Sequence, residues 1–97
     1  MVTYIMLLNW TQQGIQDIKN SPKRVDSAKK AFRGAGAKLK EFYMAMGRYD
    51  MAVIAEAPDE ETMARVALML SSAGNVRTET LKAFTEAEYR KIIGSLP

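Results

Sequence analysis

Apolar side chains on both faces of two predicted strands are the strongest constraint on the fold of this chain. The segments Val2–Asn9 and Met51–Ala57 carry apolar residues at odd and even positions alike, and Glu56 is the only charged residue in the second segment. Since neighbouring side chains of a strand point to opposite faces, both segments predict central strands that are covered on both sides. A layer of helices covers one face, and the simplest cover for the other is a second copy of the chain.

Signals around these strands predict the remaining elements. Ser21-Pro22 begins a helix, with the hydroxyl residue at the N-cap and proline at the first helical position, and Thr85 to Glu88 form the capping box of a last helix. In chain order we predict the strand 2–9, the helix 21–35, the strand 37–46, the strand 51–57, the helix 58–74, the strand 76–84 and the short last helix.

This order of elements predicts one α+β domain over residues 1–97. With right-handed crossovers, two interlocked β-α-β units give a ferredoxin-like βαββαβ antiparallel sheet of strand order 4-1-3-2, with the helices on one face and a further helix at the end. Pairing of two such sheets through their open faces would form a dimeric α/β barrel. We therefore expect the chain to associate with itself as a homodimer or larger assembly.

Two residue types that carry much of protein chemistry are missing. The chain contains no cysteine and no histidine. Their absence excludes disulfides, thiolate nucleophiles, histidine bases and zinc sites built from these ligands, so we expect no metal and no cofactor. The first ten residues lack a basic lead, and no apolar run approaches the roughly 20 residues of a membrane span. We therefore expect a cytoplasmic protein that does not enter a membrane.

The basic residues are concentrated in one part of the chain. The net charge is +3, but the stretch Lys19–Lys40 contains eight basic residues and a single acidic one, Asp26. Such a stretch forms either a solvated helix face or a surface that faces anions. We expect no specific nucleic-acid binding, because the strand 51–57 has none of the aromatic side chains on which bases stack.

Four short motifs, in this order, resemble the GYD-domain family over nearly the whole chain. They are Ser21-Pro22-Lys23-Arg24, Gly47-Arg48-Tyr49-Asp50, Glu56-Ala57-Pro58-Asp59 and Gly74-Asn75-Val76-Arg77-Thr78. The resemblance implies a ferredoxin-like subunit of the dimeric α/β-barrel group, and it implies no particular reaction. For Gly47 and Asp50 we expect structural roles, because glycine allows a positive φ and aspartate binds nearby backbone in turns.

Two groups of charged residues on the strands are candidate functional residues. Arg77 and Glu79 share one face of the last strand, where they either border an enclosed site for a small carboxylate or carbonyl compound, or form an ion pair. Glu56, with Tyr43 as an aromatic neighbour, is a general base if it is desolvated, and otherwise reaches water at the end of its strand.

A third candidate lies at the start of the helix 21–35. Lys23 and Arg24 occupy its first turn, where the helix dipole disfavours cations. We expect either an anionic ligand there or a salt bridge, within the chain or to a second copy.

These residues lead to three hypotheses of function. We favour a small homo-oligomeric protein that binds a small anionic or carbonyl-bearing molecule near the sheet, through Arg77, Glu79, Tyr43, Lys23 and Arg24. The first alternative is a cofactor-independent isomerase or monooxygenase, with Glu56 or Glu79 as base and Arg77 as electrostatic stabiliser. The second alternative is a structural or regulatory subunit that binds only protein.

Overall fold

The structure, a computed structural model that describes all 97 residues, contains one four-stranded antiparallel sheet. The central strands are β1 (Val2–Trp10) and β3 (Met51–Ala57), and the edge strands are β2 (Lys38–Met44) and β4 (Val76–Ala83). The strand order β2-β3-β1-β4 is the predicted order, so the ferredoxin-like topology is confirmed.

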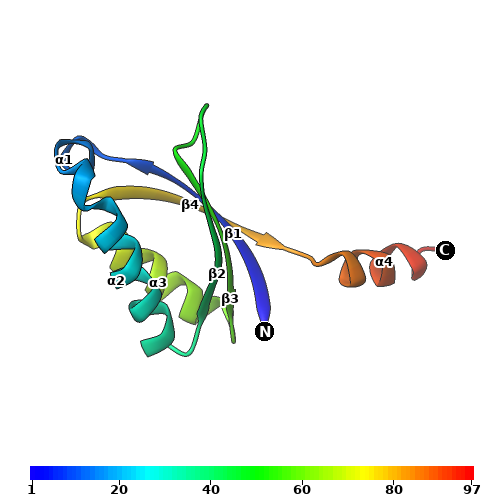
Figure 1. Cartoon of the computed structure of the whole chain (residues 1–97). Coiled ribbons are helices and arrows are strands. Elements are labelled where there is room, and N and C mark those ends of the chain that lie inside the picture. Colours follow the sequence, from blue (N-terminus) through cyan, green and yellow to red (C-terminus); the bar gives the residue numbers. More distant parts are fainter.

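Two long helices cover one face of this sheet (Figure 1). They are α2 (Ser21–Gly34) and α3 (Glu60–Ser72), and the short helices α1 (Gln12–Gln16) and η1 (Ile18–Asn20) lead from β1 into α2. The opposite face of the sheet carries no helix in Figure 1, and we call it the open face. No helix is both long enough and apolar enough to cross a membrane.

The ends of the long helices follow from their capping residues. Asp59 is the N-cap of α3, where its carboxylate accepts the backbone N–H of Thr62 at 2.8 Å. Helix α2 ends just before Gly36, which takes the left-handed φ of +79°. The prediction of Ser21 as N-cap was wrong: the N-cap is Asn20, which makes no side-chain capping bond, and Ser21 is the first helical residue.

The core lies between the helices and the sheet. It receives alternate residues of β1 and β3, together with side chains from α2 and α3, and its largest fully buried side chains are Phe32, Met6 and Val66. The buried cluster consists of Tyr4, Met6, Leu8, Phe32, Ala37, Met51, Val53, Ala55, Ala57, Met63 and Val66. Because only one parity of each central strand is buried here, the other parity is left on the open face.

Strand β2 departs from strict alternation. Alternation would place Leu39 and Phe42 on opposite faces, yet both pack against the core. A register shift between Leu39 and Glu41 inserts one extra residue, Lys40, into the edge strand. Such a bulge moves the following side chains to the other face, so that Glu41 and Tyr43 lie on the open face.

The loop after β1 is fastened to the loop before β4. The N–H of Thr11 donates to the carbonyl of Asn75 at 3.0 Å, and its hydroxyl donates to the carbonyl of Gly74 at 2.5 Å. Gly14 is buried against the backbone of Asn75, and a Cβ at this position would overlap the Asn75 carbonyl oxygen. These contacts join segments more than 60 residues apart at the same end of the sheet as Trp10.

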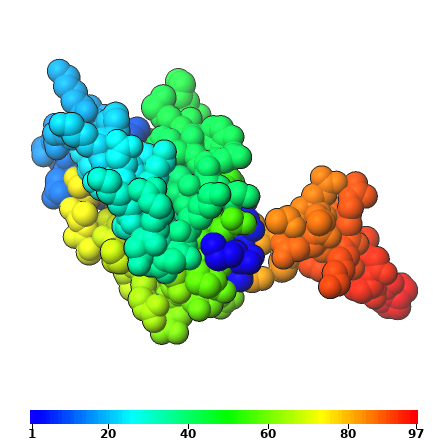
Figure 2. All heavy atoms as spheres, turned by 60° about the horizontal axis from the view of Figure 1, so that its bottom comes forward, coloured from blue at the N-terminus to red at the C-terminus, as the bar shows by residue number.

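Helix α4 (Glu86–Gly94) stands away from the rest of the molecule. It begins with the predicted capping box of Thr85 and Glu88, and every one of its residues is exposed. Figures 1 and 2 show it as a separate lobe beyond the end of β4. The Cα radius of gyration is consequently 14.6 Å, whereas a compact chain of this length has about 12.5 Å.

Candidate functional site

The open face of the sheet has an apolar centre. Ile5 of β1 pairs with Ile54 of β3 on one side and with Leu81 of β4 on the other, and Leu7 follows on the same face. None of these four side chains is buried, and Leu81 is 44% exposed. An apolar row across three strands without a covering layer is typical of an interaction surface.

The turn Gly47–Asp50 is tied to the central strand β1. The carboxylate of Asp50 accepts the backbone N–H of Trp10 at 3.0 Å, and the N–H of Asp50 donates to the carbonyl of Leu8 at 3.0 Å and to the Asn9 side-chain oxygen at 3.1 Å. Gly47 takes a φ of +156°. Both residues have structural roles, as predicted, but Asp50 binds the backbone of a neighbouring strand and not that of its own turn.

Tyr49 connects this turn with the candidate residues of β4. Its hydroxyl donates to the Glu79 carboxylate at 2.8 Å, so the side chain reaches over β1, which separates the turn from β4. Arg77 pairs with Asn9 on the same face. We call Asn9, Tyr49, Arg77 and Glu79 the Tyr49 cluster; it forms the polar end of the open face.

The chemistry of the Tyr49 cluster is that of a hydrogen-bonding site. The hydrogen bond to Glu79 raises the pKa of Tyr49 above its ordinary value, which already keeps the phenol protonated at neutral pH. Arg77 forms no ion pair within the chain, and its guanidinium is free to bind an anion. Tyr49 was not predicted as a site residue, although its place between Gly47 and Asp50 fixes it beside β1.

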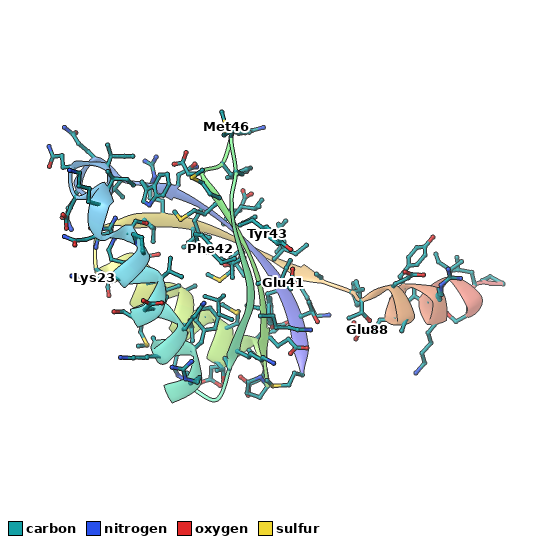
Figure 3. The ribbon with its side chains drawn as sticks, viewed as in Figure 1. Lys23, Glu41, Phe42, Tyr43, Met46 and Glu88 are labelled. Atoms are coloured by element: carbon teal, nitrogen blue, oxygen red, sulfur yellow. The ribbon has the colours of Figure 1, made fainter.

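Glu56 and Tyr43 lie on the open face but are not brought together. Glu56 forms an ion pair with Lys40 at 3.8 Å, whereas Tyr43 donates to Glu41 at 2.5 Å, which raises the pKa of Tyr43. Tyr43 is paired with Ala52, four residues from Glu56, so the two lie about 13 Å apart along the sheet. Figure 3 shows Glu41 and Tyr43 on the side of β2 away from the helices.

The two cations at the start of α2 have different surroundings. Arg24 donates to the backbone carbonyls of Asp17 and Gly14 at 2.8 and 3.1 Å, and it lies 3.6 Å from the Asp17 carboxylate. Arg24 therefore holds the connection between β1 and α2. Lys23 is exposed and has no ion-pair partner, and the labelled side chain lies on the outer side of α2 in Figure 3.

An apolar pocket lies between α2, α3 and the sheet, and it was not predicted from the sequence. Its volume is about 280 Å³, and 15 of its 19 lining residues are hydrophobic. They include Met6, Leu8, Trp10, Val25, Phe32 and Met69. We call it the α2 pocket. Its walls suit apolar side chains or an apolar molecule, and the one charged residue among them, Arg24, is bound to Asp17 and Gly14.

Comparison with known proteins gives one family and several related folds. A family model described as the GYD domain matches residues 4–93. A protein of Thermus thermophilus named "Glutamine synthetase and cystathionine beta-lyase binding protein" is 34% identical over 89 residues, which cover 91% of this chain and 94% of that protein.

Solved structures share the fold. A crystal structure of a Thermus thermophilus protein is 26% identical, with a TM-score of 0.57 over 88% of this chain and 95% of the other. A feast or famine regulatory protein of M. tuberculosis, complexed with L-methionine, has a TM-score of 0.67 over 88% of this chain at 10% identity, and the match spans 51% of that protein. At such low identity the second similarity concerns the fold alone.

Proposed function

Because this chain belongs to the GYD domain family, we propose that it is a small binding protein that pairs with itself through the open face and attaches to an enzyme through its helices. The relative from Thermus thermophilus, which is named for binding two enzymes, supports this class of function. The observation that carries the proposal is the uncovered apolar row on one face of the sheet, together with the exposed basic side of α2 on the other.

The open face supports self-pairing because its centre is apolar and because both copies present the same surface. Two antiparallel sheets pack face to face about 10 Å apart, and their inner side chains then form a second core. In that arrangement Ile5, Ile54 and Leu81 of both copies become buried. The helices of both copies point outward and remain available for another partner.

Light scattering coupled to gel filtration tests the pairing. We expect a dimer for the wild type and, for Ile54→Asp, a weakened dimer that dissociates at a higher protein concentration, because the substitution places an unpaired charge in the centre of the buried face. Ala64→Asp is the matched control, since Ala64 is an exposed residue of α3, and it should remain a dimer. A monomeric wild type, or a dimer that Ile54→Asp leaves intact, would contradict the pairing.

The outer side of α2 supports binding to an acidic protein surface. Lys23, Lys29, Lys30 and Arg33 are all exposed, and none of them forms an ion pair within the chain. Such a patch attracts an acidic partner over the Debye length and orients the encounter. The name of the relative makes glutamine synthetase and cystathionine beta-lyase the partners to test first.

Biolayer interferometry with each purified enzyme tests this contact. We expect Lys30→Glu to weaken binding at least about five-fold, with a loss that shrinks as salt is added. The control Arg65→Glu makes the same change of charge on α3, where Arg65 is paired with Glu61 at 2.7 Å, and should bind as the wild type does. The proposal is wrong if neither enzyme binds, or if both variants are weakened equally.

The Tyr49 cluster favours a second function, the binding of a small anionic or carbonyl-bearing molecule. The free guanidinium of Arg77 lies on the same face as Tyr49, and its N–H donors suit a carboxylate or a ketone oxygen. Glu56 and Glu79 are engaged by Lys40 and Tyr49, which favours binding over proton abstraction.

Titration with pyruvate, followed by NMR, tests this second function. Arg77→Ala should abolish the shifts while the dimer mass is retained, and Arg65→Ala should leave them unchanged. Equal loss of the dimer and of the shifts would instead make Arg77 a residue of the pairing face.

A further inference from the structure

Helix α4 carries an apolar stripe that its own chain does not cover. Tyr89, Ile92 and Ile93 are spaced as i, i+3 and i+4, so they lie on one side of the helix, and Leu96 follows two residues after its end. They are between 44% and 62% exposed. A helix of nine residues is marginal in water by itself, so its stripe has to pack on another surface for the helix to persist.

The α2 pocket is a surface of the matching kind. An amphipathic helix binds an apolar groove through anchors at this same spacing. The pocket extends along α2 from Ser21 to Phe32, a length of about 16 Å, and the stripe from Tyr89 to Ile93 measures about 6 Å. Small side chains at Ala28 and Ala31 line the α2 side and permit a close approach.

Helix α4 does not lie over the α2 pocket of its own chain. Leu8, in the floor of the pocket, pairs with Thr78, and Phe84 follows six residues later, about 20 Å along the sheet. One residue links Phe84 to α4, and the distance from Phe84 to Ile92 along the linker and the helix is only about 16 Å. The helix would also have to cross from the sheet to the helix layer, a further ~10 Å. Figures 1 and 2 show α4 pointing away from α2 and α3.

We propose that α4 is exchanged between two copies of this chain, and that each copy places Tyr89, Ile92, Ile93 and Leu96 over the α2 pocket of the other. Each chain thus supplies both the apolar anchor residues and the pocket that binds them. Reciprocal exchange forms a closed, two-fold symmetric dimer. The exchange is compatible with paired open faces, since the helix layer of the facing copy lies about 20 Å from the sheet in the direction perpendicular to it. Phe84 to Leu96 spans about 22 Å.

Cross-linking tests the exchange directly, because the chain contains no cysteine. An equal mixture of the single variants Ile93→Cys and Ala28→Cys should form a disulfide between the two different variants under mild oxidation. The matched control replaces Ile93→Cys by Lys91→Cys, which lies on the opposite side of α4 and should cross-link at least about ten-fold less. Equal cross-linking of both mixtures, or none in the first, overturns the proposal.

Trp10 provides a second readout, since it is the only tryptophan and lines the α2 pocket. Docking of α4 excludes water from Trp10, so Ile92→Asp should shift its fluorescence to longer wavelength, while Lys91→Asp should not. Identical emission of the wild type and Ile92→Asp overturns the exchange. This test is independent of the pairing through the open face. Ile92→Asp leaves Ile54 in place, so the dimer mass of the Ile92→Asp variant reports on the open-face pairing alone.

Discussion

Removal of the Asp50 carboxylate tests whether the turn 47–50 is held by the central strand. In the structure the Trp10 N–H donates to this carboxylate at 3.0 Å, and Asp50→Ala leaves that donor without its partner. An unpaired buried donor costs about 1–3 kcal/mol. Because Trp10 and Asp50 are only half-buried, water can bind the freed N–H and reduce this cost. We therefore expect a decrease of about 1–2 kcal/mol in the free energy of unfolding. For a domain of this size the decrease corresponds to roughly 5–15 °C in Tm.

Urea unfolding followed by circular dichroism measures this change. All variants are compared at one protein concentration, because self-association shifts the apparent stability. Asp50→Asn keeps an oxygen that accepts the Trp10 N–H and should lose less than Asp50→Ala. Tyr49→Phe keeps Asp50 and should unfold close to the wild type. The reasoning is refuted if Asp50→Ala unfolds as the wild type does, or if Asp50→Asn is as unstable as Asp50→Ala.

Three further predictions concern packing, capping and a buried hydroxyl. Gly14→Ala should destabilise by about 1–3 kcal/mol in urea unfolding, because its Cβ meets the Asn75 carbonyl, whereas Gly34→Ala, with open space at its Cβ, should not. The hydrogen bond from the α3 backbone lowers the pKa of Asp59, so Asp59 adds stability above its unfolded pKa. As pH falls below about 4, the wild type should lose more of its unfolding free energy than Asp59→Asn, and equal slopes would contradict this. The buried hydroxyl of Tyr4 has no hydrogen-bond partner, so Tyr4→Phe should raise the Tm, and a lower Tm would show that the hydroxyl is satisfied.

The fold was predictable from the sequence because its signals are local. The double-sided apolar pattern of Met51–Ala57, the capping box of Thr85 and the glycine after α2 all act within a few residues of where they occur. The errors are also local. Asn20 rather than Ser21 is the N-cap of α2. The bulge at Lys40 was not predicted, because an extra residue in an edge strand leaves no hydrophobic signal.

The candidate site was predictable only in part. Arg77 and Glu79 share the open face because they are two residues apart on one strand. The partner of Glu79 depends on how the turn 47–50 folds over β1, and the sequence carries no signal for a contact between positions 49 and 79. The α2 pocket was not predictable for the same reason. It depends on the distance between a helix and the sheet, and the residues of either element do not show that distance.

The fastening of the loop at Thr11 to the loop at Asn75 has a consequence for the order in which the chain is made. Strand β1 is synthesised first, yet one of its two neighbours is β4, which ends at Ala83. Until Val76 to Ala83 leave the ribosome, one edge of β1 has unpaired backbone groups and its apolar side chains have no complete core. The nascent chain is therefore most vulnerable to aggregation just before its last strand appears, and stable folding has to wait for nearly the whole domain.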